Sequence, residues 1–334
     1  MKSHDHQTRC NRNCENARDF SGGTPVPLFQ LNAFGVTIAL IMFTRAIVRP
    51  PVPNFAEGLT TAELGAPDYE RALAQHEAYC AALEQCGLKL TRLEPDERYP
   101  DSTFVEDTAV AISQITPSLM VGLLPHVRRG SSVFTERCAV LTRPSAPSRR
   151  GEVASIRKVL AQLFPALSEI QTPGTLDGGD VCEAGNHFFI GISERTNEAG
   201  AQQLAEMLAA LGYTSSFVDI GGTGVPPVIH AQDARAASDL LHLKSGLAYL
   251  GDNRMVVTDA LAGRAEFADY DLVRVSPDEQ YTANCVRVNN YVLVAAGYPA
   301  FAERLLEFGY QTIALEMSEF QKMDGGLSCL SLRF

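Results

Sequence analysis

One stretch contains a complete repeating unit of the fold: Tyr270-Asp-Leu-Val-Arg-Val-Ser-Pro-Asp-Glu-Gln-Tyr-Thr-Ala-Asn-Cys-Val-Arg-Val-Asn-Asn-Tyr-Val-Leu-Val294. A β-like run leads through an acidic loop with a proline to a second such run, and Asn289-Asn290 separates the second run from a third. An asparagine pair between two apolar runs is typical of a hairpin turn. The stretch therefore predicts three short strands, the last two of them in a hairpin.

The same order of elements recurs in four other places along the chain. A β-like run, a polar loop and a second β-like run begin near Leu88, Leu167, Thr214 and Gln311. Apolar residues spaced by three and four predict four helices, at residues 69–83, 153–163, 201–211 and 301–308. Three of these helices are followed by glycine where a C-cap favours a left-handed residue: Gly87, Gly212 and Gly309. The sequence therefore contains five similar units.

Five such units favour closed radial repetition, which buries strand edges and places equivalent loops around one axis. We predict an α/β fold of one closed domain, a five-bladed pseudo-symmetric α/β-propeller over residues 43–334. A linear solenoid fits less well, because no terminal unit resembles a polar cap. Three segments depart from the pattern: an N-terminal extension at 1–42, which we expect to be disordered, an insertion at 113–136 and a long loop at 221–239.

The composition narrows the class of function. The chain has 334 residues, of which 28 are Lys or Arg and 39 are Asp or Glu, so its formal net charge of −11 opposes binding to nucleic acid or to anionic membranes. Its longest apolar run, residues 34–43, is far shorter than the roughly 20 residues that cross a bilayer. Eight irregularly spaced cysteines do not make a disulfide framework, which indicates a reducing compartment and a cytoplasmic location.

Cys329 is the cysteine that best fits a catalytic role. It follows Asp324-Gly-Gly-Leu-Ser328, a loop that allows close approach of a ligand, and it opens the last β-like run. His242 precedes the inner strand of another unit in much the same way, and a cysteine and a histidine at equivalent rims make a plausible nucleophile and base. The other cysteines are expected to be buried apolar residues or, for Cys10 and Cys14, part of the extension.

Acidic residues gather at the same predicted rim: Asp101, Glu106, Asp107, Asp177, Asp180 and Asp324. Each one alone is better explained by turn capping or a solvated loop. Glu106 and Asp107 are the exception, because we expect residues 104–112 to form a strand with apolar surroundings, and a buried carboxylate requires a partner. A guanidinium matches such carboxylates, and Arg149 and Arg195 are candidates to anchor the carboxylate of a cationic amino acid.

Seven motifs resemble those of the dimethylarginine dimethylaminohydrolases, which belong to the guanidino-group-modifying enzymes with the pentein fold. They occur in family order within residues 43–334: Asp101-Ser-Thr-Phe-Val-Glu-Asp107, Thr142-Arg-Pro-Ser-Ala-Pro-Ser-Arg-Arg-Gly-Glu152, Thr175-Leu-Asp-Gly-Gly-Asp180, Arg195-Thr-Asn197, Leu241-His-Leu-Lys-Ser245, Ala283-Asn-Cys285 and Asp324-Gly-Gly-Leu-Ser-Cys329. The resemblance implies the five-bladed propeller. It also implies conversion of asymmetric dimethylarginine or monomethylarginine to citrulline plus dimethylamine or methylamine, through a covalent cysteine thiouronium intermediate.

The resemblance further implies roles for individual residues. Cys329 would be the nucleophile, His242 the general acid and base, and Asp177 the carboxylate that orients His242. Substrate binding would fall to residues in a covering flap (Leu59), at the guanidinium side (Glu106 and Asp107), at the amino-acid end (Asp101, Arg149 and Arg195) and in the lining (Met323). The expected partner is a small methylated arginine, without metal, organic cofactor, nucleic acid or membrane, and the sequence leaves a homodimer open.

Two other functions stay open at this stage. A deiminase acting on arginine or another guanidino compound would use the same cysteine, histidine and carboxylates. A catalytically silent guanidino-ligand binder would keep them, with the insertion at 113–136 blocking the site. A cysteine protease is a third option, but nothing in the chain resembles that family's local signature.

Overall fold

The structure, a computed structural model, describes residues 30–31, 37–38, 43–113, 137–221 and 240–334. The chain divides into two compact units, Met1–Leu40 and Ile41–Phe334. In the first unit, the described residues form two short antiparallel strands, β1 (Gln30–Leu31) and β2 (Thr37–Ile38). Most of the predicted extension, and nearly all of the predicted insertion and long loop, lie outside the described residues.

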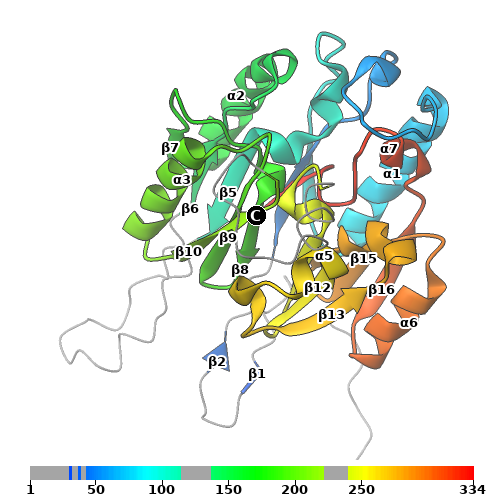
Figure 1. Ribbon diagram of the computed structural model, residues 1–334. Coiled ribbons are helices and arrows are strands. Elements are labelled where there is room, and N and C mark those ends of the chain that lie inside the picture. The colour runs from blue at the N-terminus through cyan, green and yellow to red at the C-terminus, as the bar shows by residue number, and fades with distance from the viewer. Residues whose placement is uncertain (1–29, 32–36, 39–42, 114–136, 222–239) are drawn as a thin grey trace, which may run out of the picture. The chain divides into compact units, whose positions relative to one another are not determined.

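The second unit is a mixed α/β structure built from five three-stranded sheets with one topology (Figure 1). In each sheet a strand that we call inner pairs antiparallel with a middle strand, and the middle strand pairs in parallel with an outer strand. In the order inner, middle and outer, the strands are β17 (Leu332–Arg333), β3 (Arg45–Val48) and β4 (Lys89–Arg92); β5 (Ala109–Ser113), β6 (Arg137–Leu141) and β7 (Ala166–Glu169); β8 (Val181–Ala184), β9 (His187–Ile192) and β10 (Thr214–Asp219); β11 (Leu247–Gly251), β12 (Arg254–Thr258) and β13 (Asp271–Val275); and β14 (Val286–Val288), β15 (Tyr291–Ala295) and β16 (Gln311–Leu315). The five predicted repeats are present, and the last strand of the chain shares a sheet with β3.

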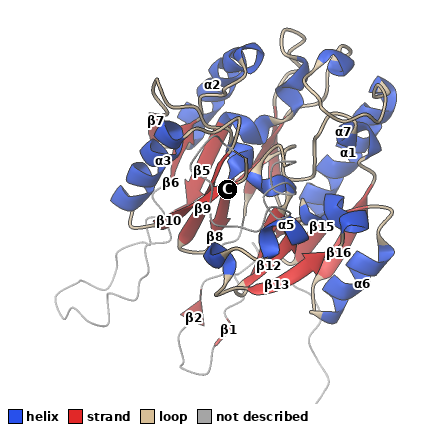
Figure 2. Ribbon diagram, in the orientation of Figure 1, coloured by secondary structure: helices blue, strands red, loops and turns tan. Residues whose placement is uncertain are grey.

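A helix joins the middle strand to the outer strand in each unit, as a parallel connection requires. These helices are α1 (Tyr69–Gln85), α2 (Val153–Leu163), α3 (Glu198–Ala210), α5 (Asp259–Ala262) and α6 (Pro299–Glu307), and a short α7 (Ser318–Gln321) follows β16. In the view of Figure 2, α1, α2, α3 and α6 lie toward the edge and the strands toward the middle. The four predicted helices are confirmed, and the three glycines after α1, α3 and α6 have the left-handed φ values expected of C-caps.

Each helix is held by apolar contacts with its own sheet. On α3, for example, Leu204 and Leu208 are fully buried in one cluster with Phe188 and Ile190 of β9. Burial of one such side chain stabilises the fold by roughly 1.5–3 kcal/mol. Among the described helices, none is long and apolar enough to cross a membrane.

The prediction of a strand over residues 104–112 is wrong in its first half. Val105–Thr108 forms a 3₁₀ turn, η3, and β5 begins only at Ala109. The hydroxyl of Thr108 donates to the carbonyl of Val105 at 2.6 Å, which closes the turn. The strand itself pairs with β6 up to Ser113 and Arg137, so the insertion between them does not interrupt the sheet.

Short turns of this kind precede the inner strands of four sheets. They are η3, η6 (Gly178–Asp180), η7 (Leu243–Ser245) and η9 (Pro277–Ala283), which lead to β5, β8, β11 and β14. A further turn that contains Cys329 leads to β17. His242 lies just before the turn η7, and so precedes the inner strand β11 as the sequence predicts.

Candidate active site

A pocket brings together nine of the ten residues for which the sequence predicts a role. Its lining includes Leu59, Asp101, Asp107, Arg149, Asp177, Arg195, His242, Met323 and Cys329. These residues come from segments that are up to 270 positions apart, counted from Leu59 to Cys329. The turns before the inner strands carry or adjoin four of them, so the repeated fold determines where the pocket lies.

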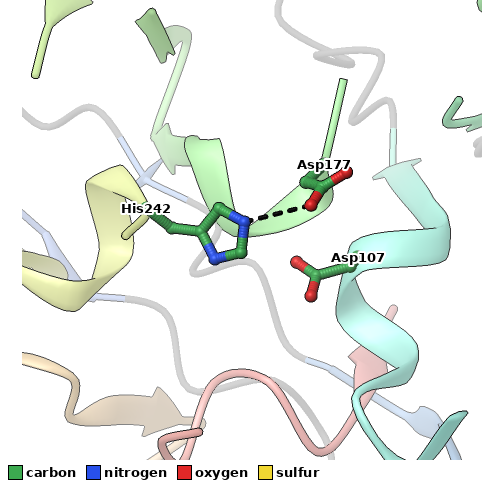
Figure 3. A group of neighbouring side chains, drawn as sticks. All are labelled: Asp107, Asp177 and His242. Carbon is green, nitrogen blue, oxygen red and sulfur yellow. Dashed lines mark hydrogen bonds and ion pairs between the residues drawn. The ribbon is translucent and has the colours of Figure 1, made fainter. Parts of the chain in front are cut away.

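His242 and Asp177 form a buried pair in this pocket (Figure 3). His242 Nε2 lies 3.1 Å from Asp177 Oδ2, and Figure 3 shows Asp107 beside the same ring. A carboxylate accepts, so Nε2 carries the proton of this hydrogen bond and Nδ1 is the nitrogen left for other chemistry. Burial disfavours the imidazolium, but Asp107, Asp177 and Asp180 outweigh it and raise the pKa of His242 to about 9.

Cys329 lies in the turn before β17 and is only 9% exposed. Burial, together with the charges of Glu106 and Asp107, raises the pKa of this thiol to about 12. The thiol is therefore protonated at neutral pH in the free pocket. A cationic ligand next to the sulfur would offset the two carboxylates and favour the thiolate.

Asp107 is tied to Arg149 by a buried ion pair. Arg149 Nη1 lies 2.6 Å from Asp107 Oδ2, and the backbone N–H of Gly179 donates to Asp107 Oδ1 at 2.9 Å. Burial disfavours the Asp107 carboxylate, but His242 and Arg149 outweigh it and lower its pKa to about 2. Asp107 is therefore a fixed negative charge in the pocket.

Arg149 has a second carboxylate partner that the sequence analysis did not single out. Its Nε and Nη2 donate to Glu152 at 3.1 and 2.9 Å, and Nη2 also donates to the carbonyl of Phe104 at 3.2 Å. Burial raises the pKa of Glu152 to about 7. Glu152 lies in the same family motif as Arg149, three residues after it. This spacing could have identified Glu152 as a partner of Arg149.

Glu106 is the predicted site residue that is not among the lining residues of the pocket. Its carboxylate lies 2.7 Å from Lys244 Nζ and 3.1 Å from Arg333 Nη2, and it accepts from the Ser328 hydroxyl at 2.8 Å. Adjacent residues of η3 thus have separate sets of partners. The sequence analysis missed Lys244 and Arg333, although Lys244 lies within the motif that contains His242.

The predicted flap is held by two carboxylates. The backbone N–H of Leu59 donates to Asp101 at 3.0 Å, and the backbone N–H of Thr61 donates to Asp324 at 2.5 Å. The Leu59 side chain is 41% exposed although it lines the pocket. Burial raises the pKa of Asp101. Asp101 and Asp324 therefore position the flap segment directly beside the pocket.

Asp180, another acid at the predicted rim, forms hydrogen bonds that position residues next to the site. It accepts from the hydroxyls of Ser193 and Thr196 at 2.7 and 2.6 Å, and from the backbone N–H of Leu243 at 2.9 Å. The last of these bonds fixes the residue after His242. Arg195, from the same loop as Ser193 and Thr196, is half-buried and reaches the pocket lining.

The structure also locates the other described cysteines and a group of side chains that could hold a metal ion. Cys80, Cys86, Cys182 and Cys285 are buried as expected, Cys138 is half-buried, and Cys10 and Cys14 lie outside the described residues. Asp107, Asp177 and His242 each offer one ligand atom within 4.8 Å of the others, a donor set that zinc could accept. The same three groups also suit proton transfer, because a histidine between carboxylates is a typical acid and base.

The fold and the pocket define a mixed α/β protein with a buried cysteine, histidine and carboxylate site. No family model matches the chain. It is 39% identical over 294 residues to the N(G),N(G)-dimethylarginine dimethylaminohydrolase of Pseudomonas aeruginosa, covering 88% of this chain and 100% of that one. It is 31% identical to the Streptomyces coelicolor protein of the same name, covering 86% of this chain and 96% of that one.

Comparison with solved structures points to the same family as comparison with these relatives. A mutant Pseudomonas aeruginosa enzyme in complex with citrulline matches with a TM-score of 0.74 and 38% identity, over 88% of this chain and 100% of that one. The N-terminal domain of a cyanobacterial arginine dihydrolase, at 17% identity, has a TM-score of 0.67 over 86% of this chain and 96% of that one, and so shares the fold. The chain belongs to the dimethylarginine dimethylaminohydrolase family.

Proposed function

We propose that this protein hydrolyses asymmetric dimethylarginine and monomethylarginine to citrulline plus dimethylamine or methylamine. The observation that carries the proposal is the buried pocket in which Cys329 shares a lining with the His242–Asp177 pair and the fixed charge of Asp107. The family membership supports the same reaction, since relatives bear that name and one of them binds citrulline.

In the first half of the reaction Cys329 forms a bond to the guanidinium carbon. The cationic substrate favours the thiolate, whose proton passes to solvent, and the tetrahedral adduct that the thiolate forms collapses as the methylated nitrogen leaves. That nitrogen is a poor leaving group unless protonated. His242, which is protonated at neutral pH, supplies the proton from Nδ1, and the amine departs to leave a covalent thiouronium on Cys329.

In the second half a water molecule attacks the same carbon. His242, now neutral, accepts a proton from this water, while Asp177 holds the ring in place through Nε2. The carbon–sulfur bond breaks, Cys329 is regenerated, and citrulline is released. The carboxylates stabilise the positive charge that makes the carbon electrophilic, so the proposed chemistry uses no metal or organic cofactor.

The substrate lies with its guanidinium against Asp107 and its amino-acid end toward Arg195 and Asp101, under Leu59. Met323 lines the side of this channel. Arg149, whose guanidinium is engaged by Asp107 and Glu152, acts through the charge it adds to the pocket. Glu106 contributes negative charge to the guanidinium side without being in the lining.

The five sheets form a closed five-bladed propeller over residues 43–334, as the sequence predicts. Two observations support this closure. The last strand, β17, pairs with β3, and inner strands of different sheets contact one another: β8 with β11, β11 with β14, and β17 with β5. A cytoplasmic location is supported by the free thiols of Cys80, Cys86, Cys182, Cys285 and Cys329.

Citrulline release by the purified chain tests the function. Asymmetric dimethylarginine should give equal amounts of citrulline and dimethylamine, and Cys329→Ser should give neither while still binding substrate. Turnover of free arginine with release of ammonia, at a higher kcat/KM than dimethylarginine, would support a deiminase instead. A ligand-induced rise of Tm without any turnover would support a silent binder.

A further inference from the structure

The turn before β14 contributes to the pocket in a different way from the turns before the other inner strands. None of the residues of this turn, η9, lines the pocket, although turns at the same position carry or adjoin site residues in the other units. Asn284 follows the last residue of this turn, immediately before Cys285 and β14, and is 7% exposed. Its side chain therefore has a role other than contact with a ligand.

Asn284 forms hydrogen bonds with both catalytic turns. Its Nδ2 donates to the backbone carbonyl of Lys244 at 2.8 Å, two residues after His242. Its Oδ1 accepts from the backbone N–H of Ser328 at 2.9 Å, one residue before Cys329, and Nδ2 also donates to the Ser328 hydroxyl at 3.1 Å. Both ends of the amide have complementary partners, so its orientation is fixed.

The turn around Cys329 is restrained from other sides as well. Arg333 donates to the carbonyl of Ser328 at 3.1 Å, and the N–H of Glu106 donates to the carbonyl of Cys329 at 3.2 Å. Glu106 also joins Ser328 and Lys244 through their side chains. Asn284 differs from these groups because one side chain bonds the backbone of both turns.

We propose that Asn284 is a positioning residue that sets the separation and angle between the Cys329 sulfur and the His242 ring. The inference rests on the proposed roles of Cys329 and His242. A nucleophile and a proton donor that act on one substrate require accurate placement, and a shift of about 1 Å can cost about 10²-fold in rate. Asn284 lies outside the pocket lining, so its removal deletes no direct contact with a bound substrate.

Replacement of Asn284 by alanine tests this role. For Asn284→Ala we expect kcat to fall about 10²-fold while KM stays within about threefold of the unmodified protein. The matched control is Asn289→Ala, which also removes three side-chain hydrogen bonds, two to the backbone of Phe43 and one to the backbone of Cys86. Asn289 has a left-handed φ of 55°, so alanine there is at least as destabilising, yet kcat should not change.

A second variant, Gly326→Ala, disturbs the hydrogen bonds of Asn284 without removing the Asn284 side chain. A Cβ at Gly326 would overlap the Asn284 amide, so Gly326→Ala should displace that amide and lower kcat with little effect on KM. Folded Asn284→Ala protein with kcat within threefold of the unmodified chain would overturn the proposal, as would an equal loss in Asn289→Ala. If Asn284→Ala does not fold, an unchanged kcat in Gly326→Ala would overturn it. Citrulline release by Cys329→Ser would instead reject the proposed role of Cys329 on which the inference rests.

Discussion

Glu106 and Asp107 are adjacent in the turn η3, yet their carboxylates belong to two different buried charge clusters. Asp107 pairs with Arg149 and lines the pocket. Glu106 pairs with Lys244 and Arg333 and is absent from the lining. The comparison between the Asp107 cluster and the Glu106 cluster shows how one short turn can supply a ligand-binding charge and a supporting charge at once.

The two clusters share one effect and differ in another. Both carboxylates raise the pKa of the Cys329 thiol, after burial, which contributes most. Of the two, Asp107 alone lines the pocket in which we propose that the guanidinium binds. A change in the Asp107 cluster should therefore alter both substrate affinity and thiol ionisation, whereas a change in the Glu106 cluster should alter thiol ionisation alone. The following experiments use this difference.

The largest effect is expected from Asp107→Asn. Removal of one partner from a buried, charged contact costs about 3–5 kcal/mol, so KM for asymmetric dimethylarginine should rise by between about 10²-fold and about 10⁴-fold. The same change removes a negative charge near Cys329 and should accelerate alkylation of that thiol by neutral iodoacetamide. Steady-state kinetics and mass spectrometry of the Cys329 peptide measure the two effects.

Arg195→Lys is the matched control for the Asp107 experiment. Arg195 is half-buried and lysine keeps its charge, so the loss of affinity should be smaller, below about tenfold. Similar losses in Asp107→Asn and Arg195→Lys would count against Asp107 as the guanidinium ligand. Slower alkylation of Cys329 in Asp107→Asn would contradict its effect on the thiol.

The next largest effect concerns pH. With the Cys329 pKa near 12 and the His242 pKa near 9, the free protein at neutral pH holds a thiol beside an imidazolium. Because the thiolate fraction far below the pKa grows tenfold with each pH unit, alkylation by iodoacetamide should rise by about the same factor per unit from pH 7 to 9. The reactive state carries one proton fewer than the neutral-pH state, so kcat/KM should also rise toward about pH 9. Alkylation that is independent of pH between 7 and 9 would show that the thiolate already dominates in the free protein.

The smallest of these effects is expected from Glu106→Gln, which probes the other cluster. Loss of this charge should accelerate alkylation of Cys329 by about tenfold at pH 8, while KM stays within about threefold. Lys244 and Arg333 lose a buried partner, so Tm should fall, and the kinetics belong well below the new Tm. A rise in KM as large as that in Asp107→Asn would place Glu106 at the guanidinium and remove the distinction between the clusters.

The sequence predicted the repeated architecture well because that information is local. Apolar spacing located α1, α2, α3 and α6, and the glycines that follow three of them have the expected backbone. The motifs also identified the pocket residues, since nine of ten line it. These features depend on residues that are close together in the chain or that match a known motif.

The arrangement around Glu106 could not be predicted in the same way. Phe104, Val105 and Ala109 suggest a strand by their apolar character, whereas the hydroxyl of Thr108 closes a turn by a single hydrogen bond. The partners of Glu106 include Arg333, which lies 227 residues away in sequence. Neither a side-chain bond to the backbone nor a contact of that separation leaves a periodic signal.

The most direct test of the account is the detection of the covalent intermediate on Cys329. His242→Gly removes the group that activates water, and S-methyl-L-thiocitrulline provides a sulfur leaving group that needs no protonation by His242. After acid quench, intact-protein mass spectrometry should show the mass of this compound less methanethiol, and peptide mapping should locate it on Cys329. Absence of any adduct on that peptide, together with citrulline release by Cys329→Ser, would contradict the assignment of Cys329 as the nucleophile.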